Sequence, residues 1–354
     1  MARSSLTGIQ KLVTRLVREV APRNRDIIAR RFGFASGRRE TLEAIGSSYG
    51  ITRERVRQIE EATVSAVAKI AQRDADVNAV VASVIDVLQR EGGVMRQDLL
   101  FQEMSGSPSL TTTNAALVFV LTVSNQVFHA PEGDHFHAFW AAHRAQADAF
   151  RSGIQALSQA LKSHAEPMEW EAFCGVAKST SAVLATGMPV NEKHLVAALA
   201  ISKDIGKNIY GQVGLSAWPQ VNPKGIRDKA YLVLKREAKP QHFSAITKLI
   251  SSATFPDGKR VNMQTVHNEL IKDKRFILVG RGLYALSEWG YQAGTVKDVL
   301  VHTLKEAKSP LPKAELISRV LANRMVKEST IVLNLQDSAT FAKQADGTYT
   351  LRKA

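Results

Sequence analysis

Apolar residues recur at helical spacing in several separate stretches of the chain. Within each stretch they stand at i, i+3 or i+4, and i+7, and the pattern stops at Gly or at a polar residue before Pro. A second stretch with the same spacing begins soon after each stop. The pattern therefore predicts four pairs of helices, at 77–93 with 95–104, 149–164 with 168–177, 226–240 with 242–250, and 296–310 with 313–321.

Each predicted helix pair is followed by a β-like segment rich in aromatic residues. An apolar strand entry, a turn at Gly with a polar neighbour, and an alternating aromatic exit are typical of a β-hairpin. These hairpins recur roughly every 60 to 80 residues, the size of a winged-helix module. A helical protein with unrelated hairpins would show a similar order, so this alternative stays open. The hairpins are predicted at 127–140, 205–218, 275–289 and 340–351.

The segment 41–60 has a different pattern, that of two short helices joined by a tight turn. Gly50 suits the left-handed conformation that ends the first helix, and Thr52 is a good N-cap for the second. A capped helix start directs free amides toward a phosphate, so Thr52 is itself a candidate DNA-binding residue. The residues spaced to pack the two helices together are Leu42, Ile45, Ile51, Val56 and Ile59.

The first turns of the second helix carry polar and charged side chains that suit base edges. Arg pairs with guanine, Glu with the cytosine amino group and Gln with adenine, each good pair contributing about 1–3 kcal/mol of discrimination. An ordinary solvated helix face, with Glu54 and Gln58 as an i, i+4 pair, is the alternative. The side chains in question are Arg53, Glu54, Arg55, Arg57 and Gln58.

Residues 22–70, and above all TLEAIGSSYGITRERVRQIE, resemble region four of bacterial primary sigma factors. We extend this resemblance to residues 11–73. It implies that Arg53, Glu54 and Gln58 read the upstream promoter hexamer, while Arg55 and Arg57 lie nearer the DNA backbone. Arg38 and Arg39 precede the first helix of the pair, and we expect them to contact phosphate, which orients a protein without specifying sequence.

The resemblance also implies a polymerase contact. Sigma factors dock region four on the flap of the RNA polymerase β subunit through the apolar face of its earlier helices. Phe32 and Phe34 are candidates for this contact, and core packing is the alternative for both rings. Only ten residues precede Lys11, and no aromatic-rich melting region follows. We therefore expect a protein that does not open promoters alone.

The remaining modules are assigned by pattern and by weaker resemblance. Residues 223–291, with KPQHF near the start and GRGLYALSEW near the end, resemble the HARE-type helix-turn-helix domain shared with the delta subunit of bacterial RNA polymerase. The whole chain resembles bacterial fusions of region four with winged helices and a HARE domain. The predicted fold is mainly α, with tandem helix-turn-helix and winged-helix modules and short β-hairpin wings. The predicted modules are 1–73, 77–144, 148–222, 223–293 and 294–354.

Charge strengthens the expectation of a nucleic-acid partner. The 354 residues carry a formal charge of +14 with a sequence pI near 9.9, which favours polyanionic partners. Residues 1–73 hold 15 Lys/Arg and 7 Asp/Glu, a net +8, which leaves +6 for the other 281. A lone cysteine, Cys174, excludes an intramolecular disulfide and a Cys-based zinc site. The chain contains no run of about 18 apolar residues, so we expect no membrane span.

These patterns predict a transcription factor or RNA polymerase accessory protein that binds double-stranded DNA in the cytoplasm, in association with the nucleoid. We expect no enzyme activity, no metal and no cofactor, because His129, His135 and His137 stand without a carboxylate cluster. An architectural protein that bridges DNA with little sequence preference is the main alternative. A scaffold whose HARE-like module binds only protein is another, and a nuclease is the least supported. Oligomeric state is not predicted.

Overall fold

The computed structural model describes Leu6 and residues 8–258 and 260–352. Residues 1–5, 7, 259 and 353–354, which fall in the first, fourth and last predicted modules, lie outside the described residues. The chain forms two compact units. One runs to Lys207 and includes Gly211–Ser216, and the other comprises Asn208–Tyr210 and the chain from Ala217 onward. Both units are mainly helical with small antiparallel sheets, which confirms the predicted fold class.

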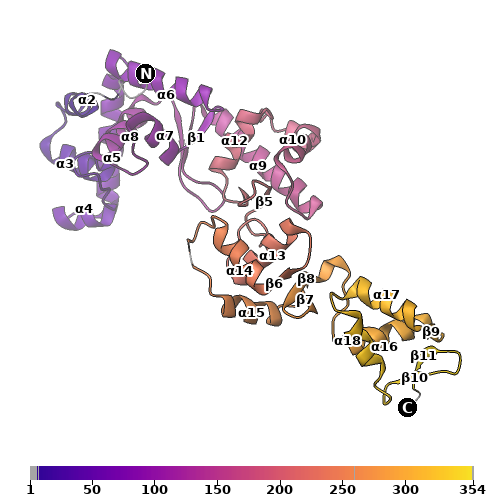
Figure 1. The fold of residues 1–354 in the computed structure, drawn as a ribbon. Helices are drawn as coiled ribbons and strands as arrows, with labels where there is room; N and C mark the ends of the chain where they lie inside the picture. Colours follow the sequence, from indigo (N-terminus) through magenta and orange to yellow (C-terminus); the bar gives the residue numbers. More distant parts are fainter. Residues whose placement is uncertain (1–5, 7, 259, 353–354) are drawn as a thin grey trace. The chain divides into compact units, whose positions relative to one another are not determined.

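The first unit begins with a group of helices that contains the predicted helix-turn-helix (Figure 1). Its second half carries two further helix groups, each closed by a hairpin. The first group is α2 (Ile9–Leu16), α3 (Pro22–Phe32), α4 (Leu42–Tyr49) and α5 (Arg53–Ala71). The next is α6 (Ala75–Arg90), β1 (Val94–Arg96), α7 (Gln97–Ser105), α8 (Thr112–Ser124), β2 (Phe128–Ala130) and β3 (Phe139–Ala141). The third is α9 (Arg144–His164), α10 (Trp170–Ser179), α11 (Ser181–Leu184), α12 (Glu192–Ile201), β4 (Ile205–Lys207) and β5 (Val213–Leu215).

The second unit repeats the same order of elements twice. Its first repeat is α13 (Ile226–Glu237), β6 (Gln241–His242), α14 (Phe243–Ser252), α15 (Met263–Lys272), β7 (Phe276–Gly280), β8 (Leu283–Leu286) and the 3₁₀ turn η1 (Ser287–Trp289). Its second is α16 (Val296–Ala307), β9 (Leu311–Pro312), α17 (Lys313–Asn323), α18 (Glu328–Leu335), β10 (Phe341–Lys343) and β11 (Thr348–Leu351).

Three of the four repeats have the topology of a winged helix: a helix, a short strand, two helices and a hairpin. The repeat from α9 to β5 lacks the short strand and has an additional four-residue helix, α11. In the other three repeats the short first strand pairs with the last strand of the hairpin, as in the order β1-β3-β2. In the remaining repeat a single bridge from Met168 to Val213 takes the place of that strand. The predicted hairpins and the first two helices of each repeat are confirmed. A third helix in each repeat was implied by the winged-helix assignment but was not located in the sequence, and the short first strands were not predicted.

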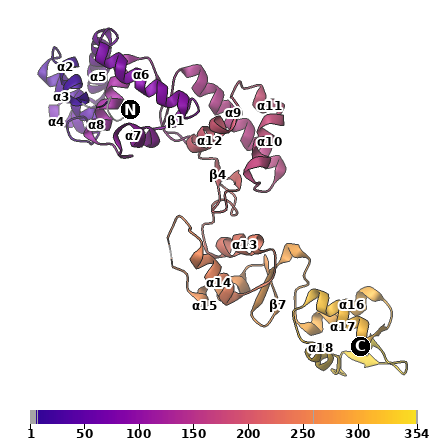
Figure 2. The same ribbon diagram turned by 45° about the horizontal axis from the view of Figure 1, so that its top comes forward.

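Helix α8 lies among the N-terminal helices of the first unit and packs against two of the predicted modules (Figure 2). Every residue from Asn114 to Leu121 is buried, and the helix packs against α2, α3, α5 and α6. The rings of Phe32 and Phe34 lie 5.0 and 5.2 Å from the ring of Phe119. The helices before Arg73 and the following winged helix therefore share one hydrophobic core.

Each repeat of the second unit has a hydrophobic cluster of its own. One gathers around Tyr231 and Ile246, and the other around Leu300 and Leu316. The division of the chain into five modules remains a prediction. The shared core in the first unit and the separate clusters in the second show how side chains pack, but they do not show which segments fold independently. Among the described residues, no helix is both long and apolar enough to cross a membrane.

Candidate nucleic-acid interface

The helix-turn-helix is formed by α4 and α5, and its packing follows the predicted residues. Ile45, Val56 and Ile59 are buried together with Ile27 of α3, and Leu42, Tyr49 and Ile51 pack against them. Gly50 ends α4 with φ 62° and ψ 35°, which is the left-handed conformation expected of it. The Thr52 hydroxyl accepts a hydrogen bond from the amide of Arg55, so Thr52 is the N-cap of α5.

Gly46, which the sequence pattern did not single out, sets how closely the two helices approach. A Cβ atom at Gly46 would lie 2.6 Å from the carbonyl oxygen of Ile51, a distance that real Cβ atoms do not reach. The amide of Ile51 also donates to the carbonyl of Gly46 at 3.0 Å. A small residue inside an amphipathic helix was the available signal, because glycine in a helix interior is otherwise unfavourable.

The candidate base-reading side chains are exposed on the first turns of α5. Arg57 makes a bidentate ion pair with Glu54, at 2.7 and 3.0 Å, and also contacts Glu61. Arg55 donates to the side-chain oxygen of Gln58 at 3.2 Å. Hydrogen bonds from Arg57 hold the pKa of Glu54 below its usual range, so Glu54 is an ionised acceptor. Within the described residues, Arg53 has no hydrogen-bond or ion-pair partner in this group.

These pairs define what a base contact would have to displace. Glu54 can accept from a cytosine amino group only by sharing or leaving Arg57, and Gln58 must likewise turn away from Arg55. Arg53 requires no such exchange. The site is thus a partly self-paired polar surface, with Arg53 as its unpaired cation.

Arg38 and Arg39 lie in the turn between α3 and α4, directly ahead of the α4 N-cap Thr41. Both side chains are exposed. The surrounding protein and the nearby Arg31 guanidinium lower the pKa of Arg39, so a negatively charged group would be favourable there. This environment suits the phosphate contact expected of Arg39. Contact with DNA by these two residues stays a prediction.

The expectation that Phe32 and Phe34 contact polymerase is not supported by their surroundings. Phe34 is buried and Phe32 is partly buried, and both rings pack on Phe119 of α8. An apolar ring already covered within its own chain offers little surface to a partner. We therefore assign Phe32 and Phe34 to the core, which was the alternative for both.

An apolar hollow on the same group of helices remains uncovered. It has a volume of about 250 Å³ and lies between the end of α2, the start of α3 and the second half of α5. Ile70 is half exposed at this hollow. Its apolar lining residues are Leu16, Val20, Ala21, Ala62, Ala66, Val67 and Ile70. Sequence periodicity identifies apolar helix faces, but it could not distinguish this uncovered face from the apolar face that α8 covers.

Comparison with known proteins identifies one segment of the chain. Residues 16–69 match the family described as "Sigma-70, region 4". Over 41 residues the chain is 51% identical to RNA polymerase sigma factor SigA of Nostoc sp., a match that covers 12% of this chain and 10% of that protein. SigA1 of Synechococcus elongatus matches to the same extent, at 51% over 41 residues.

A further relative matches over a longer segment. The RNA polymerase principal sigma factor HrdD of Streptomyces coelicolor is 40% identical over 57 residues, which is 16% of this chain and 17% of that protein. The chain thus spans about a tenth of the length of the SigA relatives it matches. No solved structure matches the chain. The resemblance to the HARE domain remains a prediction, and the family match is confined to residues 16–69, which match Sigma-70 region 4.

Proposed function

We propose that the protein binds promoter-like double-stranded DNA through α5 and acts in transcription together with RNA polymerase. The observation that carries this proposal is the exposed group Arg53, Glu54 and Gln58 on a capped helix within a region 4 segment. The N-terminal end of such a helix suits phosphate, and its first exposed side chains suit base edges in the major groove.

The test compares substitutions near the start of α5 with substitutions just beyond its end. Arg53→Ala and Gln58→Ala should each weaken binding to the best promoter-like duplex by about 1–3 kcal/mol and relax the preference for one base pair. Arg73→Ala and Gln72→Ala, exposed positions just beyond α5, are the matched controls and should leave that preference unchanged. Equal affinity for promoter-like and random duplexes in the unmodified protein would favour the architectural alternative.

We also propose that the hollow lined by Leu16, Val20 and Ile70 receives the polymerase β flap. The support is an uncovered apolar surface on the region 4 segment, with Ile70 50% exposed, and relatives that are RNA polymerase sigma factors. Ile70→Glu should abolish capture of core RNA polymerase by the full chain. Leu184→Glu, which also alters a side chain that is 50% exposed, should not. Loss of capture by both variants, or by neither, would exclude this surface.

Our third proposal is that the protein does not open promoters by itself. Mixed with core polymerase and a linear promoter, it should give a complex without permanganate-reactive thymines. Adding a primary sigma factor should then restore opening or be antagonised. A bubble formed without any sigma factor would show that the chain contains a melting element.

A further inference from the structure

The four winged-helix repeats differ in whether their third helix is available to a partner. Helix α8 is buried from Asn114 to Leu121, and α12 packs against β1, where Gly92 approaches the backbone of Lys193. Helix α15 buries only Val266 and Leu270, and its opposite face is open. Since the third helix is the one that a winged helix can lay in a DNA groove, the first two repeats are poor candidates and the third is a good one.

Charge divides the repeats in the same way. Residues 74–222 carry 9 Lys/Arg and 14 Asp/Glu, a net −5. Residues 223–293 carry 13 Lys/Arg and 6 Asp/Glu, a net +7, and residues 294–354 carry 10 and 6, a net +4. A polyanion would therefore be repelled by the middle of the chain and attracted to the repeat that contains α15.

The open face of α15 has the chemistry of a groove contact. Gln264 and Asn268 lie one turn apart and hydrogen bond to each other at 3.1 Å. Such side-chain amides can donate to and accept from base edges. Cations flank the helix, with Arg260 before it and Lys272 and Lys274 at its end, and all three are exposed. Within the described residues, neither Arg260 nor Lys274 has an ion-pair partner.

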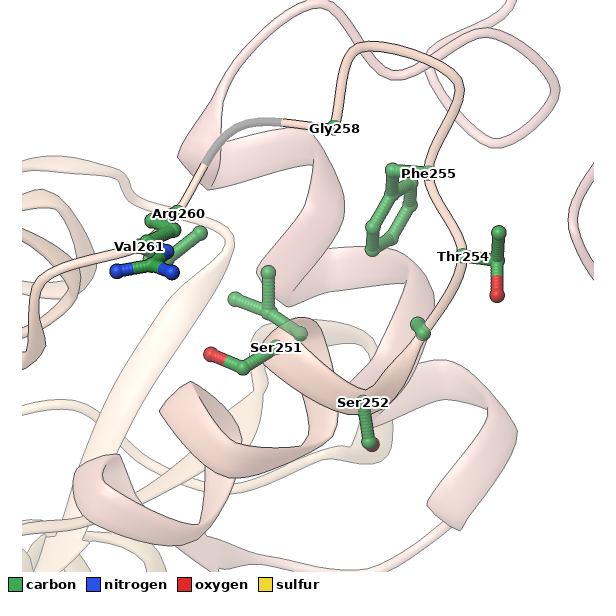
Figure 3. A pocket seen from close by; sticks show the side chains of 9 residues that line it. Ser251, Ser252, Thr254, Phe255, Gly258, Arg260 and Val261 are labelled. Atoms are coloured by element: carbon green, nitrogen blue, oxygen red, sulfur yellow. The ribbon is translucent and has the colours of Figure 1, made fainter.

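A hollow of about 570 Å³ lies between the end of α14 and the loop that leads to α15 (Figure 3). Arg260 and Val261 stand on one side of it, and Thr254 and Phe255 on the other. Ser251 and Ser252 already donate to helix carbonyls, so Arg260 is the charged donor at this hollow.

An ion pair with α13 holds the loop that lines the hollow. The buried Lys229 ammonium contacts both carboxylate oxygens of Asp257, at 2.6 and 2.8 Å. It also lies 4.8 Å from the ring centre of Phe255. This ion pair between a buried ammonium and an exposed carboxylate ties Asp257 and the start of the loop to α13.

We infer that α15 and the loop ahead of it, with Arg260 beside the hollow, form a second contact with duplex DNA, separate from α5. Arg260, Lys272 and Lys274 contact backbone phosphates, while Gln264 and Asn268 face the groove. This contact adds affinity that depends on salt and carries little of the sequence preference, because phosphate contacts position a protein without specifying bases.

The test measures binding of the full chain to a random-sequence duplex as a function of salt. The triple variant Arg260→Ala, Lys272→Ala, Lys274→Ala should reduce the slope of log K against log salt by about 0.9 for each lost contact, up to about 2.7. The matched control Lys162→Ala, Lys178→Ala, Lys193→Ala removes the same charge from exposed positions of the acidic part and should leave the slope nearly unchanged. Equal reductions, or no reduction in the first variant, would overturn the inference.

Two further measurements separate this contact from the one made by α5. Gln264→Ala with Asn268→Ala should weaken binding about two- to tenfold for each hydrogen bond lost, without a change in slope. The triple variant should keep its ratio of affinity for promoter-like over random duplex, and loss of that ratio would contradict a separate contact. If the unmodified protein bound promoter-like and random duplexes equally well, that result would count against the proposed function but not against the second contact. An unchanged melting temperature in each variant would exclude unfolding as the cause.

Discussion

At the scale of single residues, Gly46 and the two threonine caps determine the geometry of the candidate interface. Thr41 and Thr52 each accept a hydrogen bond from a backbone amide in the first turn of the helix that follows. Gly46 lets the start of α5 lie directly against α4. Small side chains and caps of this kind fix where Arg53 and Gln58 stand.

Replacing Gly46 with Ala should destabilise the protein and weaken DNA binding. The added Cβ would overlap the carbonyl oxygen of Ile51, at a cost of about 1–3 kcal/mol, and would push the turn away from α4. Gly175→Ala is the control, since it also lies inside a helix but has nothing within 4 Å of the added Cβ. That change should stabilise by about 0.5–1 kcal/mol, as judged by urea denaturation. Effects of the same sign at both positions would contradict the close approach.

His129 predicts a pH dependence of stability in the first unit. Burial, and the nearby Arg39, lower its pKa to about 4 from an ordinary value of 6.5. Its Nε2 lies 3.0 Å from the side-chain oxygen of Gln97, and its ring stacks on Trp140. Because the unfolded chain takes up a proton below about pH 6.5 and the folded chain only near pH 4, the free energy of unfolding should fall across this window as pH decreases.

Comparing the unmodified protein with His129→Gln isolates that contribution. Urea midpoints measured from about pH 7 to about pH 4 should fall less steeply for the variant, since it lacks the titrating imidazole. The same steepness in both proteins would mean that His129 is protonated as easily in the folded state as in the unfolded state.

At the scale of elements, α8 is the helix through which the N-terminal helices and the following winged helix pack together. An amphipathic helix has one apolar face, but TTNAALVFVLTVS is apolar nearly all round, which is typical of a helix buried on every side. Its neighbours α2, α3, α5 and α6 come from both sides of the predicted boundary between modules. The region 4 segment in this chain therefore has part of its apolar surface covered by the chain itself.

Truncating Phe119 should affect both predicted modules together. Phe119→Ala would leave a cavity beside Phe32 and Phe34 and should cost about 3–5 kcal/mol. Amide hydrogen exchange should show lower protection in α2 and α5 as well as in α6. The control Leu316→Ala, in the last repeat, should lower protection in α16 and leave α5 unchanged. Lower protection confined to α6 and α8 would mean that the two modules open independently.

Sequence periodicity predicted most elements but not their partners. The helix-turn-helix was predicted to the residue at Gly50 and Thr52, because turn and cap chemistry is local. The hairpins were predicted from alternation and glycine, which are also local. The third helices were missed since α8 has no polar face and α18 has only eight residues. Core packing of Phe32 and Phe34 was foreseen as an alternative, but their partner Phe119 was not, because it lies on a helix about 80 residues further along the chain.

At the scale of the whole molecule, charge is segregated into a basic start, an acidic middle and a basic end. The net values are +8 for residues 1–73, −5 for residues 74–222 and +11 for residues 223–354. Two basic parts on one chain can engage one DNA molecule together, and the second then binds at a high effective concentration. The acidic middle limits adhesion to DNA along the remainder of the chain.

A protein truncated after residue 222 should lose affinity for DNA in general but keep its preference for promoter-like sequence. It would lose the part that carries +11, so binding to a random duplex should weaken and become less dependent on salt. Its ratio of affinity for promoter-like over random duplex should be kept, because α5 and its neighbours remain. Titrations of both proteins at several salt concentrations would check this. A truncated protein that is folded but has lost the ratio would place base recognition in the second unit.

The core shared through α8 has a consequence for synthesis on the ribosome. Leu12, Val13 and Phe34 are made early, but the helix that covers them is completed only at Ser124. Between Arg73 and Ser124 the ribosome adds about 50 residues, which takes roughly 3–10 seconds at ~5–20 residues per second. During that interval the region 4 segment exposes an apolar surface on the nascent chain, where a chaperone that binds hydrophobic segments could shield it.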